Sequence, residues 1–111
     1  METVKINGFW WEYIEKHPDF TGILTKSSGV KSWWLNGKLH REGGPAVEHV
    51  NGSKSWFLNG KRHREDGPAI EYADGDKAWY LNDINLTEKE WKLKIRKKKL
   101  KRIIDEYNNS I

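Results

Sequence analysis

Apolar side chains alternate with polar or small ones in short stretches of this chain, and pairs of turn-forming residues separate the stretches. Around Asn51-Gly52, Val47 precedes the pair, and Trp56 and Leu58 follow it at two-residue spacing. Alternation with a period of two is typical of β-strands, and Asn-Gly between two such runs favours a tight hairpin turn. The pattern therefore predicts a β-hairpin centred on Asn51-Gly52.

The hairpin pattern recurs with a fixed offset of 23 residues. Residues 29–48 and 52–71 align without a gap, and a third copy begins at Gly75 and then diverges. A worn copy precedes them, because Trp10-Trp11 stands 23 residues before Trp33-Trp34. A period of this length predicts an array of repeated structural units. The expected units span residues 1–28, 29–51, 52–74 and 75–86.

Each complete copy contains a second turn signal. Asn36-Gly37 and Asn59-Gly60 supply this turn, and Gly44-Pro45 and Gly67-Pro68 then begin the next strand. Successive strands joined by tight turns pair as an antiparallel meander. The expected fold is therefore mainly β, a meander of tandem 23-residue hairpin repeats over residues 1–86. A helix of the same domain closes it, which makes the chain α+β overall.

The predicted turn also decides which face of the sheet each side chain occupies. A two-residue turn at Asn51-Gly52 pairs Val47 with Trp56, an aliphatic–aromatic pair that stabilises neighbouring strands. The same register gives two equivalent pairs, Leu24 with Trp33 and Ile70 with Trp79. We expect this face to form the core. The opposite face, which is expected to be partly exposed, carries the aromatic residues Trp34, Phe57 and Tyr80.

Residues 87–111 are expected to form a capping helix. Thr87 and Glu90 have the spacing of a capping box, and no Gly or Pro follows before Tyr107. On a helical wheel one apolar stripe contains Leu93, Leu100, Ile103, Ile104, Tyr107 and Ile111. We expect this stripe to dock on the sheet or on a second copy of the chain, as a homodimer. Trp91 is expected to pack over the last hairpin, because repeat arrays need their open end covered.

The repeated string Trp-aromatic-Leu-Asn-Gly-Lys-x-His-Arg-Glu-x-Gly-Pro-Ala resembles MORN-type repeats. It is most similar to the variant copies in small proteins of phages and large DNA viruses. The resemblance covers about residues 22–86 together with the worn first copy. It implies a scaffold for assembly and binding, in a phage or viral accessory protein that binds and blocks a host protein such as a defence factor. The His-Arg-Glu-Asp-Gly-Pro stretch departs from the commonest MORN pattern, so no lipid-binding role is carried over.

Composition and charge narrow the classes of function. The 111-residue chain has no cysteine, which excludes a disulfide scaffold, a Cys-ligated zinc and a thiol nucleophile, and fits a reducing compartment. No signal peptide or membrane helix is expected, so the predicted location is cytoplasmic, in the host cytoplasm if the protein is viral. Residues 1–86 carry 11 Lys and Arg against 12 Asp and Glu, whereas residues 87–111 carry 9 against 4. The basic character is local to the predicted helix.

The histidines of the repeats do not predict a metal site. His17, His40 and His63 recur once per unit, and strands about 4.8 Å apart separate equivalent side chains by about 10 Å. That separation is too large for ligands that share one metal, because a zinc–nitrogen bond is about 2 Å long. We expect no cofactor and a structural role instead. His40 and His63 should hydrogen-bond the loop backbone, and Arg41 and Arg64 should pair with acidic side chains.

The sequence predicts a non-enzymatic binding module, because no nucleophile, paired acids or phosphate loop is evident. A host protein is the expected partner, and a nucleic acid or nucleotide bound by the basic helix and the aromatic face is the alternative. The candidate partner-binding residues are Trp34, Phe57, Tyr80, Arg41, Arg64, His40 and His63. The candidate residues of the basic helix are Lys94, Arg96, Lys97, Lys98, Lys99, Lys101 and Arg102. A membrane is not an expected partner.

Overall fold

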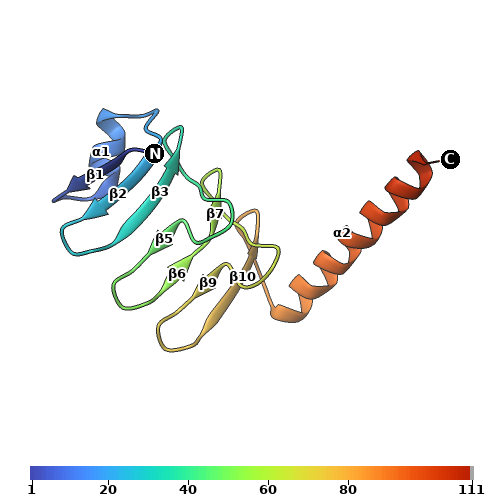
Figure 1. Ribbon diagram of the computed structural model, residues 1–111. Coiled ribbons are helices and arrows are strands. Elements are labelled where there is room, and N and C mark those ends of the chain that lie inside the picture. The colour runs from blue at the N-terminus through green and yellow to red at the C-terminus, as the bar shows by residue number, and fades with distance from the viewer. Residues whose placement is uncertain (111) are drawn as a thin grey trace.

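A long sheet leads into a projecting C-terminal helix in the computed structural model, which describes residues 1–110 and therefore leaves out Ile111 of the predicted stripe (Figure 1). The molecule measures 55 × 34 × 19 Å along its principal axes. The strands are β1 (Thr3–Ile6), β2 (Gly22–Lys26), β3 (Lys31–Leu35), β4 (Lys38–Leu39), β5 (Val47–Glu48), β6 (Lys54–Ser55), β7 (Phe57–Leu58), β8 (Lys61–Arg62), β9 (Ile70–Glu71), β10 (Lys77–Leu81) and β11 (Ile84–Leu86). The helices are α1 (Trp10–Lys16) and α2 (Glu88–Asn109).

The main sheet is mixed, and its strands are ordered β1-β2-β3-β5-β6-β9-β10-β11, with β4 paired to β3. β1 runs parallel to β2, and every other pair is antiparallel. β7 and β8 form a separate antiparallel pair. The fold is therefore mainly β and broadly α+β. Within residues 1–110, neither helix is long and apolar enough to cross a membrane.

Tight turns form at the second turn signals, as predicted. Leu35 pairs with Lys38 across Asn36-Gly37, whose φ angles are 50° and 78°. Asn59-Gly60 has almost the same angles, 51° and 80°. Positive φ at both central residues is the requirement of a type I′ turn, and Asn and Gly tolerate that region better than other residues. These turns follow directly from local sequence chemistry.

The predicted register at the other turns was wrong by one residue. Gly52 has a φ of 94°, but Asn51 does not adopt a positive φ. The His49 backbone N–H donates to the Ser53 carbonyl at 2.9 Å, so the loop contains three residues instead of two. In such a loop only the last residue needs a positive φ. Val47 consequently pairs with Ser55 and not with Trp56.

This shift inverts the face assignment of the strand that follows each turn, because adjacent residues of a strand point to opposite faces. Leu24, Val47 and Ile70, which precede the turns, are buried as predicted. Val47 also pairs with Ser32, so the core face continues to Trp34, which is only 8% exposed. Phe57 is 9% exposed, whereas Trp56 is half-buried. The prediction that Trp34 and Phe57 lie on a partly exposed face was therefore wrong, as was the placement of Trp33 and Trp56 in the core.

The worn first copy is not a hairpin, because its Trp10-Trp11 pair begins helix α1. Trp10, Tyr13 and Ile14 recur at the spacing of one helical face. They pack against a core cluster of Phe20, Leu24 and Trp34. The Asn-Gly pair of this copy, Asn7-Gly8, precedes the segment, and none occurs where Asn36-Gly37 stands 23 residues later, so the helical period prevails over the strand expected from the repeat. α1 thus covers the N-terminal end of the core.

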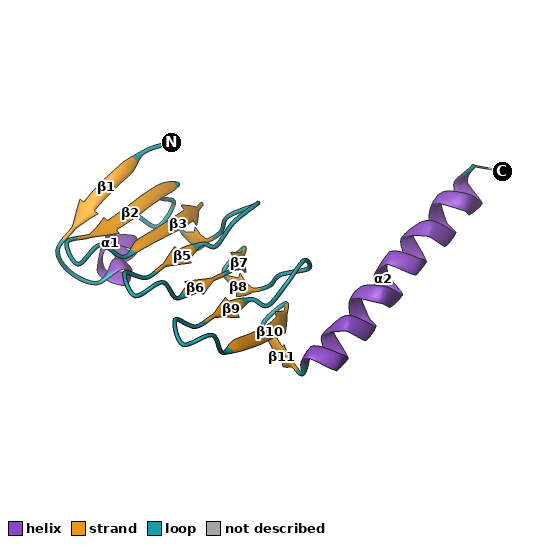
Figure 2. Cartoon of the chain, turned by 60° about the horizontal axis from the view of Figure 1, so that its bottom comes forward, coloured by secondary structure: helices purple, strands orange, loops and turns teal. Residues whose placement is uncertain are grey.

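Helix α2 begins with the predicted capping box, in which the Glu90 N–H donates to Thr87 Oγ1 and the Thr87 N–H donates to the Glu90 carboxylate. Trp91 and Ile95 are its buried residues. After this first part the helix extends away from the sheet (Figure 2). The apolar stripe was predicted to dock on the sheet or on a second copy of the chain. The first alternative was wrong, because Trp91 and Ile95 on the opposite arc dock on the sheet instead, and the second stays a prediction. Within the described chain the stripe is exposed.

Candidate partner-binding site on the C-terminal helix

The arginines of the repeats stack on tryptophans of the same copy. The guanidinium carbon of Arg41 lies 4.0 Å from the centroid of the Trp33 ring, and that of Arg64 lies 3.8 Å from the Trp56 ring. Such cation–π contacts gain strength as they are desolvated. Arg64 also donates to Glu71 at 2.9 Å, as Arg41 donates to Glu48 at 3.3 Å. The predicted pairing of Arg41 and Arg64 with acids is confirmed, and both guanidinium groups are engaged inside the sheet.

The histidines of the repeats hold the turn of the following copy, as predicted. Nδ1 of His40 accepts the backbone N–H of Asn59 at 2.9 Å, and Nδ1 of His63 accepts that of Asn82 at 3.0 Å. An accepting Nδ1 places the ring proton on Nε2, which for His63 lies 2.9 Å from a Glu65 carboxylate oxygen. His40 and His63 therefore join neighbouring copies.

The first copy makes the equivalent contact with a different residue. The Asn36 N–H donates to Thr21 Oγ1 at 2.9 Å, in place of a histidine nitrogen. His17 instead follows α1, and its ring centroid lies 4.3 Å from that of Tyr13. The 23-residue offset thus places His17 in register with His40 in the sequence without giving it the same contact.

Trp91 of α2 takes the position that an arginine occupies in the earlier copies. Trp79 follows Trp56 by 23 residues, but the position 23 residues after Arg64 is Thr87, the N-cap of α2. The Trp91 ring lies 4.7 Å from the Trp79 ring, and its Nε1–H donates to the Arg64 carbonyl at 2.9 Å. The prediction that Trp91 covers the last hairpin is confirmed, and α2 is anchored to the end of the sheet.

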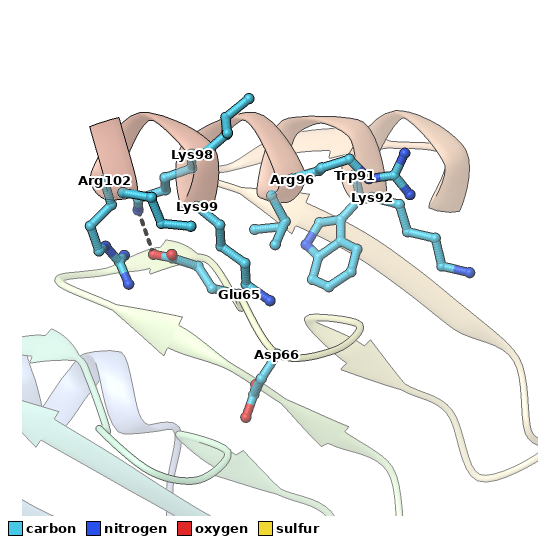
Figure 3. Close-up of a pocket in the computed structure, with 11 residues that line it drawn as sticks. Glu65, Asp66, Trp91, Lys92, Arg96, Lys98, Lys99 and Arg102 are labelled. Atoms are coloured by element: carbon cyan, nitrogen blue, oxygen red, sulfur yellow. Dashed lines mark hydrogen bonds and ion pairs between the residues drawn. The ribbon is translucent and has the colours of Figure 1, made fainter. Parts of the chain in front are cut away.

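A second anchor joins α2 to the loop between β8 and β9. Lys98 Nζ lies 2.8 Å from the same Glu65 oxygen that His63 contacts (Figure 3). The Lys98 hydrogen bond, followed by that of His63, lowers the pKa of Glu65 below its ordinary value of 4.5. The carboxylate is therefore ionised at neutral pH and ties the middle of the helix to the sheet.

An open groove of about 840 Å³ separates α2 from this loop. Figure 3 shows Lys99 and Arg102 extending from the helix toward the loop that carries Glu65 and Asp66. Cationic and aliphatic side chains of α2 form most of its wall. Its lining consists of Glu65, Asp66, Trp91, Lys92, Ile95, Arg96, Lys98, Lys99, Leu100, Arg102 and Ile103. The groove therefore combines positive charge with apolar surface.

The arc of α2 that faces away from the sheet carries an exposed apolar surface, here called the outer stripe. Its members are between 46% and 65% exposed. They are Leu93, Leu100, Ile103, Ile104 and Tyr107. Single exposed apolar residues are common on protein surfaces, but a contiguous apolar strip on a projecting helix is typical of an interaction surface.

The structure separates the predicted partner-binding residues into two groups. The first group is aromatic: Trp34 and Phe57 are buried, and Tyr80 is half-buried. The guanidinium carbon of Arg62 lies 5.7 Å from the centroid of the Tyr80 ring. Those of the second group, the histidines and arginines of the repeats, contact other parts of the sheet. By contrast, every candidate of the basic helix is exposed. The outer stripe was recognised in the sequence only as a docking surface, although its helical spacing already placed it opposite Trp91 and Ile95.

Comparisons of the chain with protein-family models, with curated proteins and with solved structures gave no match.

Proposed function

We propose that the protein is a non-enzymatic binding module that holds a partner protein on helix α2. The observation that carries this proposal is the exposure of the outer stripe on a helix whose other arc is anchored by Trp91 and Ile95. Leu93, Leu100 and Tyr107 follow one another at seven-residue spacing. An apolar face with this period suits a helix that lies in a hydrophobic groove of its partner.

The scaffold of this module is proposed to be an array of MORN-like hairpin repeats over residues 1–86, with residues 87–111 as its capping helix. Two observations support the array. Asn36 and Asn59 occupy the same backbone conformation 23 residues apart, and Asn82 repeats it with a φ of 49°. The Arg–Trp stack also recurs at the same offset. The unit over residues 1–28 departs from the pattern through α1.

The resemblance to small phage and viral repeat proteins supports a specific version of this function. In that version the protein is an accessory factor that acts in the cytoplasm of a host cell and blocks a host protein. A stripe of large aliphatic residues beside a row of cations suits this use, because apolar contacts supply affinity while charges speed association. No group with catalytic chemistry is part of the proposed site.

Nucleic-acid binding is the second candidate, and the free cations of α2 favour it. Of its nine Lys and Arg residues, only Lys92 and Lys98 form ion pairs among residues 1–110. The other seven are available to phosphates, whose neutralisation gives a strongly salt-dependent affinity. This candidate leaves the outer stripe without a use, and for that reason it ranks second.

The two candidates separate in a capture experiment from host lysate that is treated with nuclease and washed at high salt. We expect the wild-type chain to retain a protein band, and the Leu100→Gln/Ile104→Gln variant to lose it with the fold intact. Val50→Gln is the control, because Val50 is 69% exposed on a turn far from the helix in sequence. Loss of all bound material on nuclease treatment, with no effect of the stripe variant, would support nucleic acid instead. A stripe variant that changes only the oligomeric state would identify a second copy as the partner.

A further inference from the structure

We propose that the groove between α2 and the β8–β9 loop binds an acidic, extended peptide segment that also carries an apolar side chain. The proposal rests on the proposed function, since it names the chemistry of a segment of the partner protein. It concerns a surface distinct from most of the outer stripe, with Leu100 and Ile103 on the border between the two. Such a partner would contact both surfaces at once.

The acidic side chains in the groove, Glu65 and Asp66, both have a partner within the protein. Glu65 is bound by His63 and Lys98. Asp66 accepts a hydrogen bond from Arg64 Nε at 2.9 Å. The lining carries five Lys and Arg side chains against these two acids, so positive charge is in excess and an anion is the complementary occupant.

Three cations of the groove have no ion pair within the described chain: Arg96, Lys99 and Arg102. They recur every third residue, so at 1.5 Å per residue they extend over about 9 Å of helix axis. An extended peptide advances about 3.3 Å per residue, which places side chains of the same face about 6.6 Å apart. Two carboxylates at alternate positions can therefore reach this row of cations together.

The apolar part of the lining favours a peptide over a single-stranded nucleic acid. Leu100 and Ile103 are 55% and 62% exposed at the border of the groove and can receive an aliphatic side chain. The aromatic residue in the lining is Trp91, which is 8% exposed and packed against Trp79. Its ring thus presents no open face to a base, and base stacking is a main source of affinity for single strands.

The test is fluorescence anisotropy with a short labelled peptide in which Glu alternates with other residues and one central residue is Leu. The groove variant is Arg96→Gln/Lys99→Gln/Arg102→Gln. Its matched control is Lys94→Gln/Lys97→Gln/Lys101→Gln, which removes the same charge from the same helix outside the groove lining. We expect the groove variant to lose affinity about tenfold, because three charge contacts are removed, and the control to lose less than about twofold.

Equal losses in the two variants would overturn the proposal, because they would indicate attraction to the net charge of the helix. Tighter binding of an oligothymidine of the same charge, with the same dependence on the groove variant, would replace the peptide by nucleic acid. Failure of the wild-type chain to bind the acidic peptide would also overturn it. The proposed function would survive that failure wherever protein capture still depends on Leu100 and Ile104, so the two ideas fail separately. Helical circular dichroism of each variant verifies that the fold is retained.

Discussion

In the sheet, Arg64 lies against the Trp56 ring and donates to the Pro68 carbonyl and the Glu71 carboxylate, so that its side chain is 18% exposed. In helix α2, Arg96 and Arg102 are exposed and form no ion pair within residues 1–110. The residue type is the same, but in one region its hydrogen-bonding capacity is used by the protein and in the other it is available. The recurring arginine is used within its own copy, and the recurring histidine joins that copy to the next one. Of Arg64, Arg96 and Arg102, the two that form no ion pair within the described residues lie in the segment that does not repeat.

The largest expected difference between the two regions is in the loss of stability when an aromatic side chain is truncated. Phe57→Ala should destabilise the protein by about 3–5 kcal/mol, because it truncates a core ring that is 9% exposed. Tyr107→Ala on the outer stripe should stay within about 0.5 kcal/mol of the parent, since Tyr107 is 65% exposed. Chemical denaturation of both variants provides the measurement. A Tyr107 variant that loses as much stability as the Phe57 variant would show that the stripe is covered within the protein.

An intermediate difference in the loss of stability is expected when an arginine of each region is replaced. Arg64→Gln should cost about 2 kcal/mol, because it removes the stack on Trp56 and leaves the Pro68 carbonyl and Glu71 without their donor. Arg102→Gln should be nearly neutral. Thermal melts at matched ionic strength distinguish the two, and equal melting temperatures would contradict the structural role given to the repeated arginines.

The smallest expected effect is on the pH dependence of stability, through the contact of Glu65 with Lys98 and His63 that links the sheet to the helix. Since Lys98 and then His63 hold the pKa of Glu65 below its ordinary value, this contact stabilises the folded protein above that value and is lost as the pH falls through the lowered pKa. The Glu65 side chain is 39% exposed, so the contribution should be below about 1 kcal/mol. Urea midpoints near pH 7 and near pH 3 should differ less for Glu65→Gln than for the parent. An unchanged difference would show that this contact does not stabilise the fold.

Features set by local chemistry were predictable from the sequence. Asn36-Gly37 and Asn59-Gly60 form tight turns because both residues tolerate positive φ, and Thr87 with Glu90 forms the capping box. The register was not predictable from Asn51-Gly52, because the same pair also fits a three-residue loop in which only the glycine has a positive φ. That single residue inverted the faces assigned to the strands that follow these turns.

The cations of the candidate site were predictable from the sequence, but the arc of α2 that faces the sheet was not. The helical wheel places the apolar stripe opposite Trp91 and Ile95, but it does not say which arc docks. The docked arc is decided by two tertiary contacts of Trp91, with the Trp79 ring and with the Arg64 carbonyl. Both partners precede α2 in the sequence, so a helical wheel of α2 alone does not include them. The burial of Trp34 and Phe57 is the reason that the proposed site uses the free arc of the helix without the aromatic face of the sheet.

The absence of cysteine allows a direct measurement of which arc of α2 is free. Single-cysteine variants at Ile95 and Ile104 place one thiol on each arc, and their rates of reaction with a thiol reagent report exposure in the folded protein. We expect Ile104→Cys to react almost as fast as the unfolded chain and Ile95→Cys to react many times more slowly. Equal rates, or protection of Ile104→Cys in dilute solution, would contradict the assignment of the outer stripe as a free binding surface.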